Sequence, residues 1–285
     1  MPVQALLLAA SAITLAGAQS AKPAATAKPA PEPLAWTRTI ALPDVYGRVD
    51  QLAVDLAAFE LFLACSSQGS VEVVDLAQGR WSRRSAELDS PQGIALLAAQ
   101  GLVAVAVAGD GSVHFLDART LEPRKVVEVG DDPRHLTLDP TGKELWVALD
   151  PGIAVLDVAS LELARRVELG GRAAAIAFAP SGDRAFVSLP GSAAVALIER
   201  GGVKPALSFA LADATGNHGL ALDDRGGTGR TLLVAARSPA ELQALDARSG
   251  KVQARLECSG DVGDVIWDAE RQRAYALGEI GRAHV

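Results

Sequence analysis

Short apolar runs alternate along the chain with groups of Gly, Asp, Pro and Ser. One apolar segment recurs and ends each time in an acidic residue: "SVEVVDL" (70–76), "SVHFLDA" (112–118), "GIAVLDV" (152–158), "AAVALIE" (193–199) and "ELQALDA" (241–247). Its acidic residues, Asp75, Asp117, Asp157, Glu199 and Asp246, follow one another at intervals of 42, 40, 42 and 47 residues. The chain therefore consists of a repeat.

Each repeat contains four such runs, two before the acidic segment and one after it. The runs are short and bounded by turn residues, which favours β-strands. Four strands in a repeat of about forty residues are typical of a propeller blade. We therefore predict an all-β fold, a β-propeller of four-stranded blades, each with strands A, B, C and D in sequence order.

Strand counting predicts five complete blades and partial ones at both ends. Residues 37–42 resemble a D strand without a blade of its own, and a sixth A strand and B strand start at Asp264 and Arg273. An N-terminal D strand would complete the last blade and leave no open sheet edge. Since the sequence has no sixth C strand, the ring as written does not close.

The recurring acidic residue is interpreted as structural. It opens a turn, where its carboxylate can accept backbone N–H groups. A residue that recurs in every repeat is also a poor candidate for catalysis.

The N-terminal region predicts export. Residues 5–18 are apolar and end in the small-x-small motif Ala16-Gly17-Ala18, as in a signal peptide; a membrane anchor is the alternative. We assign 1–18 to the signal peptide, 19–35 to an Ala/Pro-rich linker and 36–278 to the incomplete propeller. The expected location is the periplasm or the medium, with no membrane span after cleavage.

Residues 279–285, "EIGRAHV", are interpreted as non-native. One back-translation of this segment, continued by a stop codon, resembles the start of a widely used sequencing adapter. We infer that the natural reading frame was cut near Gly278 or Glu279, so Arg282 and His284 receive no functional role.

Composition limits the possible partners. The 285 residues carry a net charge of −7 and only 4% aromatic residues, which argues against a nucleic-acid binder. The two cysteines, Cys65 and Cys258, lie in distant repeats and are expected to be free, small buried residues.

Several stretches resemble the YVTN-repeat β-propellers, in particular the exported YncE-like group, which are WD40-like in architecture. They include "GRVDQLAVD", "VAGDGSVHFLDARTLE" and "GDDPRHLTLDPTGKELWVAL", and the resemblance covers about residues 46–278. The resemblance implies a ring of seven blades and, for most members, no assigned chemistry. Blade four departs from the motif, because "AAAIAFAP" carries no polar residue where its A strand begins.

A propeller binds ligands at the mouth of its central channel, where the A strands begin. Aligning those strands gives a ring of polar residues suited to a small anionic or zwitterionic ligand. The candidate binding residues are Arg48, Asp50, Gln51, Gln92, Arg134, His135, Asn217, His218 and Asp264. The same groups could instead bond to one another and to channel water.

No catalytic residue, cofactor or metal is assigned. The sequence lacks a G-x-S-x-G nucleophile motif. The function expected is a non-catalytic scaffold that binds a small ligand or a periplasmic protein at the channel mouth. The alternative is a lactonase-type hydrolase with a channel metal, for which Asp50, Asn217 and Asp264 are the candidate ligands.

Overall fold

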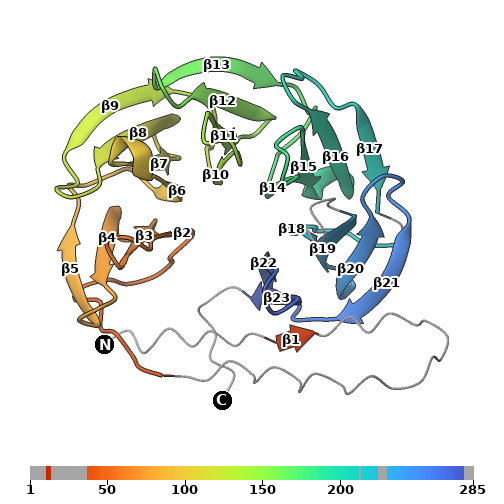
Figure 1. The fold of residues 1–285 in the computed structure, drawn as a ribbon, viewed down its shortest axis with the longest axis horizontal. Coiled ribbons are helices and arrows are strands. Elements are labelled where there is room, and N and C mark those ends of the chain that lie inside the picture. Colours follow the sequence, from red (N-terminus) through yellow and green to blue (C-terminus); the bar gives the residue numbers. More distant parts are fainter. Residues whose placement is uncertain (1–10, 14–36, 212, 224–229, 279–285) are drawn as a thin grey trace.

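The strands form six antiparallel sheets around a common axis (Figure 1). The computed structural model describes residues 11–13, 37–211, 213–223 and 230–278. Five sheets have four strands in sequence order, and the sixth has three. The fold is a β-propeller, so the predicted fold class and the five complete blades are confirmed.

The five blades divide the chain into consecutive groups of strands. Blade one comprises β2 (Leu52–Asp55), β3 (Glu60–Cys65), β4 (Ser70–Asp75) and β5 (Arg80–Arg84). Blade two comprises β6 (Pro91–Leu97), β7 (Leu102–Val107), β8 (Ser112–Asp117) and β9 (Pro123–Glu128). Blade three comprises β10 (Leu136–Leu138), β11 (Glu144–Ala148), β12 (Ile153–Asp157) and β13 (Glu162–Val167). Blade four comprises β14 (Ile176–Phe178), β15 (Arg184–Leu189), β16 (Ala194–Glu199) and β17 (Leu207–Ala210). Blade five comprises β18 (Gly219–Asp223), β19 (Thr231–Arg237), β20 (Ala240–Asp246) and β21 (Val252–Glu257).

The sixth sheet has the order β1–β23–β22, with β1 (Ser11–Ile13), β22 (Val262–Asp268) and β23 (Arg273–Gly278). Strands β22 and β23 are the predicted sixth A and B strands. Ser11 pairs with Ala276 and Ile13 with Ala274, so β1 takes the position that a C strand has in the other blades. The sequence analysis did not foresee this pairing.

Apolar clusters between neighbouring blades hold the ring together. Five clusters each combine residues of two consecutive sheets, for example Phe62 and Val73 of blade one with Ile94 and Val105 of blade two. Side chains on successive strand positions point to opposite faces, so each internal blade contributes one face to each of two clusters. The core is thus a series of blade junctions.

The turns after the C strands have the predicted chemistry. Asp117 Oδ1 accepts the backbone N–H groups of Arg119 and Thr120 at 2.9 and 3.0 Å. Asp157 and Asp246 accept backbone N–H groups two and three positions further along in the same way. The structural role assigned to these carboxylates is confirmed.

The predicted D strand at 37–42 is wrong, because these residues lie outside every strand. Ile40 and Leu42 instead pack on the face of blade one that points away from blade two, together with Val45, Leu63 and Val74. Among the described residues, no C strand of the repeat pairs with this segment, and its apolar side chains are buried on blade one. We call residues 37–49 the strap.

The arc has two open ends, blade one and the sixth sheet (Figure 1). Leu52 on β2 is 40% exposed, whereas the residues at the same position of the next five inner strands, Ile94, Leu136, Ile176, Leu220 and Val265, are 1 to 5% exposed. Val54 and, on β22, Ile266 are exposed as well. These side chains lie on the two faces that no described sheet covers.

Both cysteines are free: Cys65 is buried and Cys258 is half-buried. Burial raises the pKa of the Cys65 thiol to about 12, as expected for an inert core residue. Among the described residues, no helix has the length and apolar character needed to cross a membrane.

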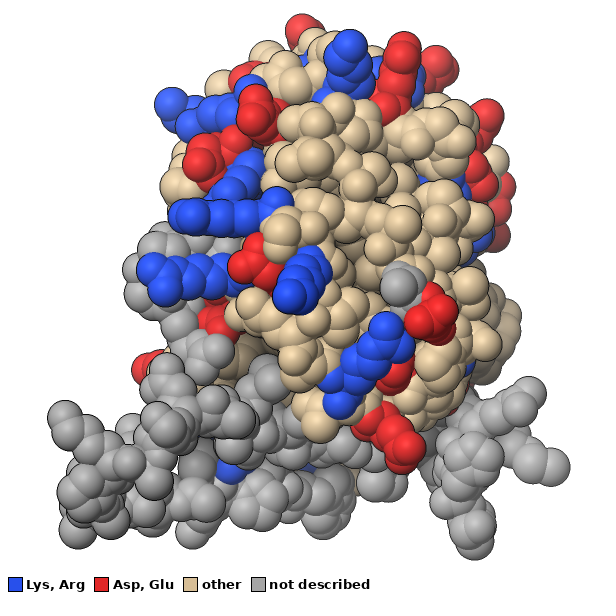
Figure 2. All heavy atoms as spheres, turned by 90° about the vertical axis from the view of Figure 1, so that its right-hand side faces the viewer, with Lys and Arg blue, Asp and Glu red and all other residues tan. Residues whose placement is uncertain are grey.

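On the side of the ring that carries β17 and β21, Figure 2 shows basic and acidic side chains interspersed around a largely uncharged centre. This side lacks the continuous basic surface that binding to nucleic acid phosphates requires.

The difference in burial between Leu136 and Leu52 can be tested by shortening each side chain to alanine. Leu136→Ala should lower the free energy of unfolding by about 2–5 kcal/mol, because it empties a packed junction. Leu52→Ala should cost about 0.5 kcal/mol, as at an exposed site. Urea unfolding followed by circular dichroism measures both, and equal losses would contradict the open-end assignment.

Candidate functional site

The predicted mouth residues lie at the entry ends of the inner strands. Arg48, Asp50 and Gln51 precede β2; Gln92 lies in β6; Arg134 and His135 precede β10; Asn217 and His218 precede β18; and Asp264 lies in β22. The inner strands surround the axis (Figure 1). The sequence alignment therefore selected equivalent positions, but their hydrogen bonds divide them into different groups.

Gln51 connects three blades through backbone groups. Its Oε1 accepts the N–H of Ile94 in blade two at 3.0 Å and the N–H of Leu136 in blade three at 3.1 Å. Its Nε2 donates to the Leu136 carbonyl at 2.9 Å. Both polar atoms of the amide are thereby used, which assigns Gln51 to the architecture of the channel.

Close backbone approach explains why other inner strands have glycine at the position of Gln51. A Cβ on Gly93 would lie 2.4 Å from the Arg134 carbonyl oxygen, and one on Gly219 would lie 2.8 Å from the Asp264 carbonyl carbon. Neighbouring inner strands can therefore touch directly. Where the residue is larger, as at Gln51, its side chain instead satisfies backbone groups of the following blades.

Arg134 joins the loop before β10 to strand β6 of the preceding blade. Its Nε donates to Asp132 Oδ2 at 2.6 Å, and its Nη1 donates to Gln92 Oε1 at 3.0 Å. The Arg134 side chain nevertheless keeps 32% of its surface exposed. These contacts fix the guanidinium in place and leave part of it accessible.

Two candidates are buried rather than accessible. Asn217 is fully buried, and its Nδ2 donates to the Ala194 carbonyl at 2.8 Å, which ties blade five to blade four. The Asp50 side chain is 9% exposed and forms an ion pair with Arg48 at 2.5 Å, while Arg48 itself is 58% exposed. Arg48 is thus the accessible member of that pair.

The histidines and Asp264 face different environments. Desolvation lowers the pKa of His135 to about 4, so its imidazole is neutral near pH 7. Ser188 Oγ donates to the His218 carbonyl at 3.1 Å. Desolvation also raises the pKa of Asp264 to about 6, although the residue keeps contact with solvent, and a bond from the Val265 N–H opposes the shift.

The proposed metal ligands are not arranged as a metal site. Asp50 Oδ1 is paired with Arg48, and Asn217 Nδ2 is used between blades, whereas Asp50 Oδ2 and Asn217 Oδ1 are buried without a hydrogen-bond partner among the described residues. Among the described residues there is no group of three or more His, Cys, Asp and Glu side chains that could hold a metal ion.

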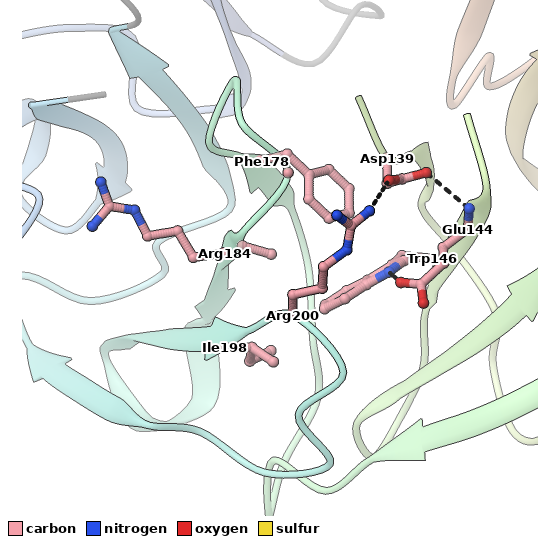
Figure 3. A pocket seen from close by; sticks show the side chains of 9 residues that line it. Asp139, Glu144, Trp146, Phe178, Arg184, Ile198 and Arg200 are labelled. Carbon is pink, nitrogen blue, oxygen red and sulfur yellow. Dashed lines mark hydrogen bonds and ion pairs between the residues drawn. The ribbon is translucent and has the colours of Figure 1, made fainter. Parts of the chain in front are cut away.

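A pocket missed by the sequence analysis lies between blades three and four, at the exit ends of β10 and β14 and so away from the mouth (Figure 3). Trp146 and Phe178 meet edge to face at 5.1 Å. Glu144 forms a bidentate pair with Arg165 at 2.6 and 2.9 Å, and this pairing lowers the pKa of Glu144. Trp146 Nε1 donates to the same carboxylate.

One ion pair joins the two blades at this pocket. Arg200 Nη2 lies 3.6 Å from Asp139 Oδ2, while Arg184 points away from that pair (Figure 3). The bidentate arginine also occurs in blade one, where Arg83 binds Glu60 and lies over Phe62. Because the arrangement recurs in two blades, we interpret it as a means of joining strands. The spacing of Glu, aromatic residue and Arg in both repeats was the signal available in the sequence.

Comparisons with known proteins support the fold alone. No family model matches the sequence, and no curated protein matches it. Among solved structures, the chain is similar to Kuenenia stuttgartiensis hydrazine synthase, with 18% identity and a TM-score of 0.71 over 82% of this chain and 76% of that chain. That protein contains a β-propeller, and at this identity the likeness extends to architecture and not to activity.

The structural role of Gln51 predicts a loss of stability on substitution. Gln51→Leu should lower the free energy of unfolding by about 1–3 kcal/mol, because backbone groups of Ile94 and Leu136 lose their partner. The control Gln78→Leu, at an exposed position, should stay within about 0.5 kcal/mol. Unchanged stability of the Gln51 variant in chemical unfolding would refute the role.

The raised pKa of Asp264 predicts a pH-dependent gain from Asp264→Asn. With a folded pKa of about 6 against the usual 3.8, ionisation costs stability as pH rises through this window. The variant should therefore raise the Tm more at pH 7.5 than at pH 4.5.

Asp268 on the same strand is the matched control for that experiment. Bonds from the Arg271 N–H and guanidinium lower the pKa of Asp268, so its ionised form stabilises the fold. Asp268→Asn should lower the Tm by a similar amount at pH 7.5 and pH 4.5, because the stability from a lowered pKa is lost only below the usual value of 3.8. A Tm change of the same sign in both variants at pH 7.5 would contradict the pKa shifts assigned to Asp264 and Asp268.

Proposed function

We propose that this chain is an exported propeller of the YVTN-repeat type that acts as a non-catalytic binding scaffold. Its location in the periplasm or the medium is inferred from the apolar N-terminal run and the small-x-small motif at 16–18. The family assignment is inferred from the repeat motifs. The propeller fold itself is compatible with a binding scaffold, since its loops gather side chains from several blades at one end of a channel.

The observation that carries the proposal is the set of accessible polar groups at the inner-strand entries. Arg48 and Arg134 expose part of their guanidinium groups. His135 is neutral near pH 7, and Asp264 keeps contact with solvent. Each group is carried by or next to an inner strand, so the ring presents donors and one acceptor on a rigid support.

This combination favours a small ligand that bears a carboxylate. Guanidinium groups bind carboxylates through charge-assisted hydrogen bonds. An amino group on the same ligand would find its acceptor in Asp264. The expected ligand is therefore anionic or zwitterionic, and the neutral imidazole of His135 adds hydrogen bonding without a further charge.

Calorimetric titration with L-glutamate, L-aspartate and succinate tests the proposal. Arg134→Ala should weaken binding at least about tenfold, the loss expected for one hydrogen bond to a charged group. Arg271→Ala is the control, since Arg271 follows the exit end of β22 and lies away from the mouth. Equal affinity of both variants would remove Arg134 from the site.

A lactone panel with added divalent metal ions tests the enzyme alternative on the same protein. A binding scaffold shows no turnover. Metal-dependent hydrolysis that is lost in Asp264→Ala would replace the scaffold proposal with the hydrolase.

A further inference from the structure

The outer strands of the five blades are edge strands of their sheets, and they follow the circumference of the ring (Figure 1). Four of them contain charged residues: their sequences are RWSRR in β5, PRKVVE in β9, ELARRV in β13 and VQARLE in β21. Charged side chains along a sheet edge oppose pairing with another strand. The outer strand of blade four, β17, reads LSFA and contains no charged residue.

The exposed surface at β17 is largely apolar. Leu207 is 51% exposed, and Val203 in the turn before the strand is 54% exposed. Ala206, Ser208 and Ala210 are exposed as well. The side of the molecule that carries β17 and β21 has a largely uncharged centre (Figure 2). Strand β17 therefore lacks the protection that charge gives to the other outer strands.

The backbone of β17 directs one set of hydrogen-bonding groups away from its sheet. Strands β16 and β17 pair in antiparallel register. The Leu211 N–H donates to the Ala193 carbonyl at 2.8 Å. Because inward and outward groups alternate along an antiparallel strand, the N–H and C=O groups of Ser208 and Ala210 point away from β16. A further extended strand can bond to these groups.

Charges of opposite sign lie at the two ends of this edge. Lys204 precedes β17 and Asp213 follows it, and both residues are exposed. When two identical strands pair in antiparallel register, the beginning of one lies beside the end of the other. Lys204 of one copy would then lie near Asp213 of the second copy at both ends of the pair. Parallel pairing would instead place like charges together.

We propose that β17 pairs in antiparallel register with β17 of a second copy of this chain, which joins two rings edge to edge in a symmetric dimer. Both copies contribute the same surface, as a two-fold interface requires. The outward groups of Ser208 would lie close to the two-fold axis. This inference goes beyond the proposed function, because β17 lies on the circumference of the ring and not at the channel mouth.

The length of the strand determines how strong the association can be. Strand β17 has four residues, Leu207–Ala210. A contact of this size buries little surface, which is typical of weak and reversible complexes. We therefore expect a dimer whose population rises with protein concentration and not a permanent one.

Sedimentation equilibrium of the 285-residue chain, from micromolar to submillimolar concentration, measures the association. Ser208→Lys brings two like charges close to the two-fold axis and should weaken dimerisation at least about tenfold. Gln253→Lys is the matched control, because Gln253 is exposed on the outer strand β21, and it should leave the dimer Kd unchanged. Both variants should keep the Tm of the parent chain, since both positions are exposed.

Charge reversal at the ends of the edge tests the antiparallel register. Lys204→Glu should weaken dimerisation about threefold or more, because two exposed ion pairs are lost. Adding Asp213→Lys should restore the affinity, because opposite charges again meet. Asp213 has a φ of 60°, which lysine adopts less readily than aspartate, so the Tm of the double variant is measured as a check of its fold.

Three results would overturn the proposal: a chain that stays monomeric over the whole concentration range, a dimer that Ser208→Lys leaves intact, or no rescue by the charge reversal. The rival surface is the open face of blade one, where Leu52 and Val54 are exposed. Loss of the dimer in Leu52→Asp, with no effect of Ser208→Lys, would assign the association to that face instead.

Discussion

Each blade of this protein has two apolar faces, and a blade cannot bury either of them by itself. Burial requires a neighbouring sheet on both sides, which forces the repeats into a ring. The five inter-blade clusters show the result, since each one draws residues from two consecutive sheets. Stability of a repeat fold of this kind depends mainly on nearest-neighbour contacts. The exposure of Leu52 follows from the absence of one such neighbour among the described residues.

The same constraint controls the polar groups near the axis. Inner strands approach so closely that Gly93 and Gly219 have no space for a Cβ. Backbone N–H and C=O groups of the inner strands still need hydrogen-bond partners. The Gln51 side chain is the partner for the N–H groups of Ile94 and Leu136. A polar residue at the mouth can therefore belong to the architecture. Only its hydrogen bonds distinguish that role from ligand binding.

The features that the sequence predicted correctly depend on residues that are close together in the chain. Blade order, strand number and the Asp turns depend on residues a few positions apart, so periodicity and turn composition were sufficient. The features that the sequence analysis missed depend on contacts between residues that are far apart in the chain. Gln51 contacts Leu136 in another blade, and residues 37–42 resemble a D strand but pair with no strand in the part of the chain that the structure describes. Alignment of the repeats placed the candidate residues at equivalent inner-strand entries, but it could not show which of their side chains already have partners.

The open arc and the channel mouth are connected through Asp264. Arg48 and Asp50 lie beside the open face of blade one, and Asp264 lies on the open face of the sixth sheet. Arg134 is held by Asp132 and Gln92 within formed junctions, and His135 lies beside it. One half of the mouth therefore lies beside the open faces, and the other half lies within formed junctions. Binding by the 285-residue chain reports chiefly on the Arg134 and His135 half, which is why Arg134 is the informative position for a ligand test.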